Sequence, residues 1–377
     1  MEETIVFNES VHKESGMTSY GKNICVTLFG GSHDAEIGLV ASGLPSGMKI
    51  DEKSIAEFLS RRAPGHSDLS TPRKEEDAPV FLSGVKNGET DGNELRVIIK
   101  NTNTRSSDYD STVPRPSHAD YPAYVKSNGK ADLAGGGHFS GRLTAPLCVL
   151  GGILKDELKR RGIMIGAHIC SIGTVSDKRF DPVSVSAKDF ETVLTNHLPV
   201  LEQEAGEKMR EQILSVKERG DSLGGMIECA AVGIPAGVGE HFFCGMESRI
   251  SSIVFSVPAV KGIEFGAGFA SSAMTGSENN DAYETDGVNI TTKTNNSGGI
   301  IGGMTDGMPL VFRCAIKPTP SIAVKQASVN LRTLENVTLE IKGRHDPCIV
   351  PRAVPVIEAA AAIAIFDALL DTGEMEK

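Results

Sequence analysis

Apolar residues recur along this chain at spacings that predict several helices. They repeat every three to four residues over 142–161 and over 200–219, as in amphipathic helices, and 246–256 fits a further helix. The segment 353–370 is rich in Ala and Ile and apolar on nearly every side, which is typical of a helix buried in a protein core.

Strand patterns lie between these helices. Residues 23–29 form an apolar run that leads into a Gly-Gly-Ser-His turn, 79–100 holds short runs broken by glycines, and 223–234 alternates. Asp51 is suited to cap a helix that ends at Arg62, just before a Pro-Gly pair. Because helices and strands are interspersed without a steady strand–helix–strand rhythm, we expect an α+β fold and not a doubly wound sheet.

One large domain is expected, because no tandem repeat or low-complexity linker divides the chain. Residues 1–16 are polar and unpatterned, and a second methionine stands at Met17. We therefore expect a loose N-terminal extension over 1–16 and a single domain over 17–377.

Composition and charge argue against several classes of protein. The net charge of −11 argues against a nucleic-acid or acidic-membrane partner. No run of 18 apolar residues occurs, and the N-terminus lacks the basic and apolar regions of a signal peptide. The 7 cysteines are scattered without a Cys-x-x-Cys pair, as for free thiols in a reducing compartment. These features predict a cytoplasmic protein without membrane contact.

Two histidines stand in settings suited to acid–base chemistry. Ser32-His33 follows an expected strand end, where an imidazole can transfer protons near neutral pH or simply bond a neighbouring carbonyl. His118 precedes Asp120 by two residues, so this carboxylate can orient the ring or complete half of a metal site. Metal is the minority interpretation, because no ligand pair such as His-Glu-x-x-His occurs.

Arginines gather in the Gly-, Pro- and Ser-rich loops of the first third of the chain, where a guanidinium suits two-pronged binding of phosphate or carboxylate. They are Arg61, Arg62, Arg73, Arg105 and Arg115. A solvated surface side chain is the alternative for each of them. Gly135–Gly137 open the helix that follows Arg142, so they form either an anion cradle or a flexible turn. No Walker A loop or Gly-x-Gly-x-x-Gly motif is present, which disfavours a nicotinamide-linked reductase.

The last quarter of the chain combines small residues with isolated cations. Two Gly-Gly pairs lie in 294–304, Lys317 opens a Pro-Thr-Pro-Ser loop, and Arg344 stands in 343–347. Such backbone can approach a bulky polyanion closely. Asp367 is a lone carboxylate in the apolar segment 353–370, so it is either a buried functional group or a solvated residue.

In this order the motifs resemble the chorismate synthase family, from Gly21 to Leu370, and the longest and most specific ones lie in the last quarter. The motifs are GGSH (30–33), RRAPG (61–65), TPRKE (71–75), SGV (83–85), RPSHADY (115–121), GGGHFSGRLT (135–144), DSLGG (221–225), PAVKG (258–262), GSENND (276–281), TNNSGGIIGG (294–303), KPTPSI (317–322), GRHDPC (343–348) and RAVPVIEA (352–359).

The resemblance implies a lyase of the shikimate pathway, which serves aromatic amino acid biosynthesis. This lyase converts 5-enolpyruvylshikimate 3-phosphate to chorismate and phosphate by an anti-1,4-elimination. It also implies a need for reduced FMN, a core of helices between antiparallel sheets, and a homotetramer. Some members reduce the flavin themselves with NADP; the lack of an extra domain here favours an external reductant or reductase.

The resemblance also assigns roles to single residues. His33 matches the proton donor to the leaving phosphate and His118 the proton donor to the reduced flavin, with Ser32 and Ser140 supporting the relay. Asp367 matches a carboxylate near flavin N5, where the C6 proton of the substrate departs. The expected substrate-binding residues are Arg61, Arg62, Arg142 and Arg344. The expected cofactor-binding residues are Lys317, Thr319, Ser321, Asn279 and Gly302, and no metal is expected.

Two departures from the family pattern concern substrate affinity. Asp34 replaces the glycine that usually follows the histidine of the Gly-Glu-Ser-His-Gly turn, whose Glu is Gly31 here, and Ala134 replaces an arginine before the triple glycine. A non-catalytic or substrate-altered flavin-binding relative is the rival interpretation. Such a relative is expected to lose an acid–base residue, and none is lost.

Overall fold

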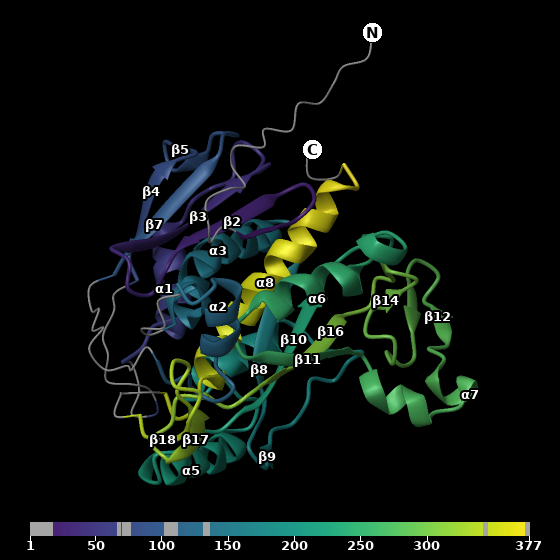
Figure 1. Ribbon diagram of the computed structural model, residues 1–377. Coiled ribbons are helices and arrows are strands. Elements are labelled where there is room, and N and C mark those ends of the chain that lie inside the picture. The colour runs from purple at the N-terminus through teal and green to yellow at the C-terminus, as the bar shows by residue number, and fades with distance from the viewer. Residues whose placement is uncertain are drawn as a thin grey trace.

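Two antiparallel sheets enclose a layer of helices (Figure 1). The computed structural model describes residues 18–65, 69, 77–101, 112–130, 136–341 and 346–373. The expected extension over 1–16 lies outside the described residues, as do Arg73, Arg105, Ala134 and Arg344.

The first sheet contains N-terminal strands in the order β1-β2-β3-β7-β4, and every neighbouring pair is antiparallel. Its strands are β1 (Thr18–Tyr20), β2 (Cys25–Gly30), β3 (Glu36–Ser42), β4 (Pro79–Ser83) and β7 (Leu95–Lys100). The second sheet has the order β11-β16-β10-β8-β9 and is also antiparallel throughout. Its strands are β8 (Met164–Ile172), β9 (Val175–Ser176), β10 (Gly225–Val232), β11 (Val260–Phe265) and β16 (Leu310–Ile316).

Among the described residues, four two-stranded hairpins flank these sheets. They pair β5 (Val85–Lys86) with β6 (Glu89–Thr90), β12 (Tyr283–Thr285) with β13 (Ile290–Thr292), β14 (Ile300–Ile301) with β15 (Met304–Thr305), and β17 (Gln326–Val329) with β18 (Asn336–Leu339). The α-helices are α1 (Glu52–Arg62), α2 (Asp120–Lys126), α3 (Thr144–Arg160), α4 (Ala187–Thr195), α5 (Gln203–Glu218), α6 (Met246–Ser256), α7 (Gly276–Asn279) and α8 (Val350–Leu370).

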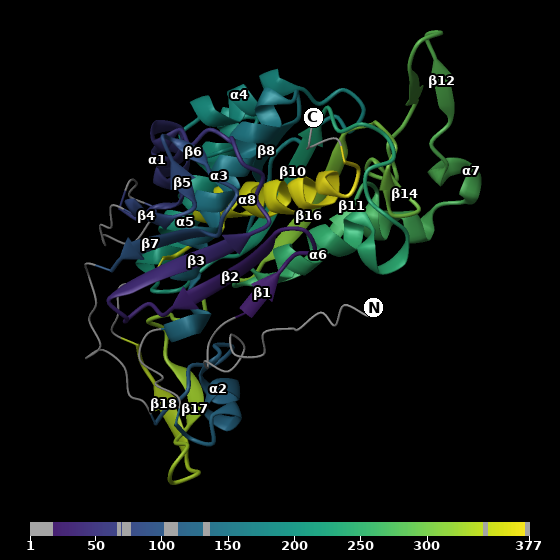
Figure 2. The same cartoon turned by 90° about the horizontal axis from the view of Figure 1, so that it is seen from above.

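The helical layer is built on α8, which runs between the two sheets (Figure 2). It packs on α1, α3 and α6 and on strands β8 and β10 of the second sheet. Gly151 of α3 permits the closest approach, because a Cβ atom there would lie 2.2 Å from the Cβ of Ala359. Most of the buried side chains of both sheets and these helices form one continuous core, and a small second cluster contains Phe180, Val185, Ala230 and Val311. The predicted α+β fold with helices between antiparallel sheets is confirmed.

Local sequence patterns correctly predicted the start of α1 and the bounds of α6. Asp51 caps α1 by accepting hydrogen bonds from the backbone of Lys53 and Ser54, both at 3.0 Å. The helix expected over 246–256 has those bounds in the structure. In the described part of the chain, α8 is the helix long and apolar enough to cross a membrane, yet it is buried almost completely inside the protein. It is therefore a core helix, as its composition predicted.

A charged network lies inside the second sheet around His168 of β8. Nδ1 of His168 is 3.2 Å from Asp177, and its Nε2 is 2.9 Å from Glu228. Arg313 pairs with Glu228 and with Glu264 at 3.3 and 2.8 Å. Burial works to lower the pKa of His168, but hydrogen bonds to Asp177 and Glu228 outweigh it and raise the pKa. Because carboxylates face both ring nitrogens, the ring carries both protons.

This arrangement predicts a pH dependence of stability. A raised pKa means that the folded state holds the proton more tightly than the unfolded state. The contribution of His168 is then complete below about pH 6.5 and is lost as the pH rises through the raised pKa. We expect the difference in unfolding free energy between parent and His168→Gln to shrink from about pH 6.5 upward in denaturant titrations. A difference that stays constant up to pH 9 would contradict a charged His168.

Candidate active site

The first part of the site is the turn that ends β2. Gly30 closes the strand with a φ of 85°, a conformation that favours glycine. The turn then closes with a hydrogen bond from the Asp34 amide to the Gly31 carbonyl at 3.1 Å. The hydroxyl of buried Ser32 lies 3.2 Å from Nδ1 of His33. The structure thus presents His33 at a strand end with Ser32 beside it, in the arrangement that the sequence predicted.

The segment that precedes α3 holds this turn in place. The Ser32 amide donates to the Gly137 carbonyl at 3.1 Å, and Nδ1 of His138 lies 2.9 Å from the Gly30 carbonyl. Because a carbonyl only accepts, Nδ1 of His138 must carry the proton. Ser140, expected in a proton relay, accepts a hydrogen bond from the Arg142 amide at 3.2 Å and so caps a 3₁₀ turn.

Two of the expected substrate arginines share one carboxylate. Arg62 and Arg142 are both buried, and each forms an ion pair with Asp77. Arg62 also donates to the Thr144 hydroxyl at 3.0 Å. The sequence analysis missed Asp77, since nothing in its local sequence distinguishes it from the acidic residues before it.

Arg61 is also paired inside the protein. It binds Glu358 of α8 through two hydrogen bonds of 3.0 and 2.6 Å, and Lys155 of α3 binds the same carboxylate. Burial works to raise the pKa of Glu358, but Arg61 and Lys155 outweigh it and hold the pKa at about 2. Arg352 of α8 links Arg62 to Asp346, because its Nε donates to the Arg62 carbonyl at 2.8 Å while its guanidinium pairs with Asp346.

His118 is oriented by a carboxylate, as predicted. Its Nδ1 lies 2.6 Å from Asp120, which also receives Nε of Arg115 at 2.7 Å and a second Arg115 nitrogen at 2.8 Å. Burial works to raise the pKa of Asp120, but the hydrogen bonds from Arg115 and His118 outweigh it and hold this pKa well below its usual value. The ionised carboxylate accepts the Nδ1 proton and leaves Nε2 as the nitrogen for chemistry. No group of three or more potential metal ligands occurs among the residues described.

The His118 loop touches the expected flavin loop. The ammonium of Lys317 donates to the Ser117 carbonyl, and Arg115 reaches the Ser321 hydroxyl at 3.4 Å. Burial, and to a smaller extent the nearby charge of Lys261, lower the pKa of Lys317. The structure therefore brings His118, Lys317 and Ser321 together.

This loop also lies near the N-terminal end of α8. The Thr319 carbonyl accepts a hydrogen bond from the Ser222 hydroxyl at 2.7 Å, and the next amide, of Leu223, donates to the Pro347 carbonyl at 2.8 Å. Pro347 follows Asp346, the partner of Arg352. The arginine cluster and the flavin loop thus meet beside the start of α8.

Asn279 and Gly302 lie elsewhere. They belong to α7 and to the β14–β15 hairpin, which sit on the side of the molecule opposite to α2, β17 and β18 in both views (Figures 1 and 2). The side-chain oxygen of Asn279 is buried, and no described group hydrogen-bonds to it. Within one chain, the structure does not bring these two residues to the Lys317–Ser321 loop.

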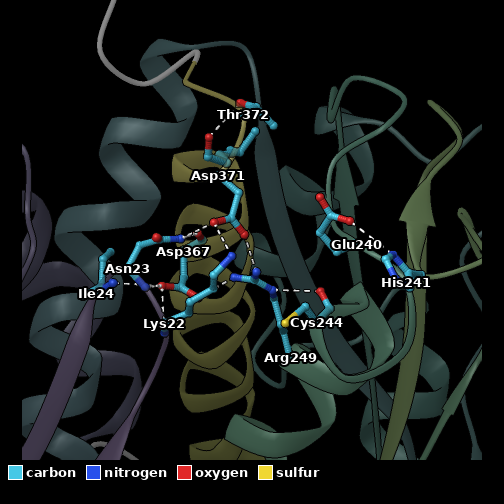
Figure 3. A network of polar contacts seen from close by, with 11 residues as sticks. Lys22, Asn23, Ile24, Glu240, His241, Cys244, Arg249, Asp367, Asp371 and Thr372 are labelled. Atoms are coloured by element: carbon cyan, nitrogen blue, oxygen red, sulfur yellow. Dashed lines mark hydrogen bonds and ion pairs between the residues drawn. The ribbon is translucent and has the colours of Figure 1, made fainter. Parts of the chain in front are cut away.

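Asp367 sits near the C-terminal end of α8, at the centre of the network in Figure 3. Its carboxylate accepts the backbone amides of Asn23 and Ile24 at 2.7 and 2.8 Å, and a guanidinium nitrogen of Arg249 at 2.6 Å. Helix geometry places it about 26 Å along the axis from Val350. These contacts anchor the start of β2 to α8 and α6, and the structure does not bring Asp367 to the His118 cluster.

Comparisons with known proteins agree with this architecture. The family model described as chorismate synthase matches residues 24–370. The chain belongs to the chorismate synthase family. The chorismate synthase of Lancefieldella parvula is 45% identical over 94% of this chain and 96% of its own length. That of Pyrococcus abyssi is 43% identical over 93% and 97%. A crystal structure of a chorismate synthase superposes with a TM-score of 0.73 at 28% identity, over 93% of both chains.

Family membership makes the chain a lyase of the shikimate pathway that acts on a small molecule, and it implies a flavin cofactor. The expected flavin loop fits such a group. The hydroxyl of Thr319 is buried, and no described group hydrogen-bonds to it. A buried hydroxyl without a partner is costly, so a ligand that supplies the missing bond is favoured here.

Thr319→Val tests this fit without measuring turnover. The variant keeps the shape but removes the unpartnered hydroxyl, so the flavin-free protein should gain about 1 kcal/mol of stability. Flavin should bind about tenfold more weakly, since about 1.4 kcal/mol is lost. Thermal melts and quenching of flavin fluorescence measure the two effects.

Thr90→Val is the matched control for this test. The buried Thr90 hydroxyl donates to the Pro45 carbonyl at 2.6 Å and accepts from the Met48 amide at 3.0 Å. This control should lose stability and keep its flavin affinity. Parent-like flavin affinity in Thr319→Val would refute a hydrogen bond between Thr319 and the flavin.

Proposed function

We propose that the chain converts 5-enolpyruvylshikimate 3-phosphate to chorismate and phosphate by an anti-1,4-elimination, with reduced FMN as its flavin. One observation carries this proposal. Two groups of residues meet beside the N-terminal half of α8. The first is the His33 turn, which is joined to buried arginines. The second is His118, which Asp120 orients and which is joined to the Lys317 loop.

The charge of the site suits this substrate, which carries one phosphate and two carboxylates. The ion pairs around the arginines contain more cations than carboxylates among the described residues. The cations are Arg61, Arg62, Arg142, Lys155 and Arg352, and the carboxylates are Asp77, Asp346 and Glu358. The surplus positive charge attracts a polyanion although the whole chain is acidic, because binding depends on local charge. Arg61, Arg62, Arg142 and Arg344 remain our candidates for substrate contacts.

His33 is suited to act on the leaving phosphate. It stands beside Ser32 in a turn that is joined to the loop of Arg142. As the bond to phosphate breaks, negative charge grows on the leaving oxygen. A proton from His33 and the positive charge of Arg142 both stabilise that charge.

Lys317, Thr319 and Ser321 would hold the FMN, with Nε2 of His118 free of Asp120 to act as a proton donor. The reduced flavin supplies electron density that protein side chains lack. Lys261 lies close enough to Lys317 to lower its pKa, so an anionic group of the cofactor would relieve this repulsion.

Asp346 is better placed than Asp367 for the acid–base task at the C6 proton. Asp346 pairs with Arg352, which bonds the Arg62 carbonyl, and it precedes the Pro347 contact toward the flavin loop. Asp367 is held by backbone amides and Arg249 toward the far end of α8. We therefore assign this task to Asp346 and a structural task to Asp367.

A homotetramer would reconcile the position of Asn279 and Gly302 with a role in cofactor binding. Both lie across the molecule from the flavin loop, so a second copy of the chain can supply them to one site. We further propose a cytoplasmic location, in keeping with the free cysteines, and an external flavin reductant or reductase.

Anaerobic turnover with chemically reduced FMN tests the function. We expect the parent to release phosphate and form the diene absorbance of chorismate together. His33→Ala and His118→Ala should still fold and bind flavin but lose at least about 100-fold in kcat, the usual share of acid–base catalysis. Flavin binding without product in the parent would instead indicate a substrate-altered relative. Parent-like rates in either variant would refute the role of that histidine.

A further inference from the structure

Asn101 joins the histidine turn to a substrate arginine. It follows β7 directly, and its backbone amide donates to the Ala35 carbonyl at 3.0 Å, which fixes it beside the exit of the turn. Its side-chain nitrogen donates to the carbonyls of Gly31 and Asp34 at 3.1 and 2.8 Å. Its side-chain oxygen accepts Nε of Arg142 at 3.0 Å.

These partners determine which way the amide of Asn101 points. Two carbonyl oxygens can only accept, so they require the NH₂ group, while a guanidinium can only donate and requires the oxygen. A flipped amide would bring oxygen against both carbonyls and nitrogen against the guanidinium. Because Gly31 and Asp34 are the two ends of the turn, the bonds of Asn101 span Ser32 and His33.

We propose that Asn101 is a positioning residue that holds His33 and Arg142 in one rigid unit. It is not a catalytic residue, because its polar atoms are engaged by the protein. The consequence is that the proton donor and the cation that act on the same leaving phosphate keep a fixed mutual geometry. This inference rests on the roles proposed above for His33 and Arg142.

Asn101→Asp tests the contacts of Asn101 with the turn separately from its contact with Arg142. The aspartate keeps the size of the side chain and an oxygen for Arg142, but it replaces the two donors with an oxygen that repels the carbonyls of Gly31 and Asp34. We expect kcat to fall about 10- to 100-fold, as for a misplacement of about 1 Å, while KM changes little. Asn101→Ala also removes the acceptor, so kcat should fall and KM should rise. Asn101→Ala keeps the test decisive if the aspartate variant does not fold.

Asn196→Asp is the matched control. The Asn196 amide donates to the Val200 carbonyl at 2.8 Å, so the same isosteric change removes the same kind of bond outside the site. We expect parent-like kcat and KM for this control. Melting temperatures of all variants show whether a loss of turnover merely follows a loss of fold.

A double-variant cycle with His33→Ala decides whether Asn101 acts through the histidine. If it does, Asn101→Asp should change kcat less than about twofold in the His33→Ala background. An equal loss in both backgrounds, or a parent-like kcat in Asn101→Asp, overturns the proposal while leaving the role of His33 intact. A parent-like rate in His33→Ala refutes that role and the proposal with it, whereas absence of product from the parent refutes the proposed reaction itself.

Discussion

The structure depends on pairing two carboxylates on a helix that is buried on nearly every side. Glu358 and Asp367 are both buried on α8. A buried charge without a partner strongly destabilises the folded state. Arg61 and Lys155 bind Glu358, while Arg249 and backbone amides at the start of β2 bind Asp367. These pairs fix α1, α3, α6 and the first sheet relative to one helix. Removing one partner of such a pair typically costs about 3–5 kcal/mol.

The two carboxylates of α8 lie in different electrostatic surroundings. Around Glu358, the pairing cations outnumber the carboxylates, and the loops of Arg142 and Lys317 converge beside the start of the helix. Toward Asp367, the donors are backbone amides and an arginine that also pairs with Asp371. These contacts stabilise the fold. Fixed arginines suit catalysis, since a site whose charges are already oriented needs little rearrangement when the substrate binds.

Sequence reasoning recovered the elements that local patterns determine. The cap at Asp51, the bounds of α6 and the nearly complete burial of α8 follow from neighbouring residues, and each is confirmed. The pairing of His118 with Asp120 was predictable for the same reason, because the two residues are two positions apart. The motif matches identified the family, but not the contacts of each side chain.

Contacts between residues far apart in the sequence could not be predicted from local patterns. Asp77 binds arginines that lie 15 and 65 residues away in the sequence. Asn101 likewise bonds Gly31 and Arg142, which are far from it in the sequence, so only the fold reveals these contacts. The position of Asp367 in an apolar segment suggested a functional carboxylate, but a buried carboxylate that backbone amides satisfy gives the same sequence pattern. Its distance from the His118 cluster depends on the direction of α8, which sequence alone does not provide.

A kinetic isotope effect can show whether the chemistry takes place beside the N-terminal half of α8. Turnover of substrate deuterated at C6 should be compared in Asp346→Asn and Asp367→Asn under anaerobic conditions. We predict that Asp346→Asn lowers kcat and raises the isotope effect, because loss of the C6 proton becomes slower. Asp367→Asn should lower the melting temperature and leave the isotope effect of the folded enzyme unchanged. A raised isotope effect in Asp367→Asn, with a parent-like value in Asp346→Asn, would instead place the loss of the C6 proton at the far end of α8.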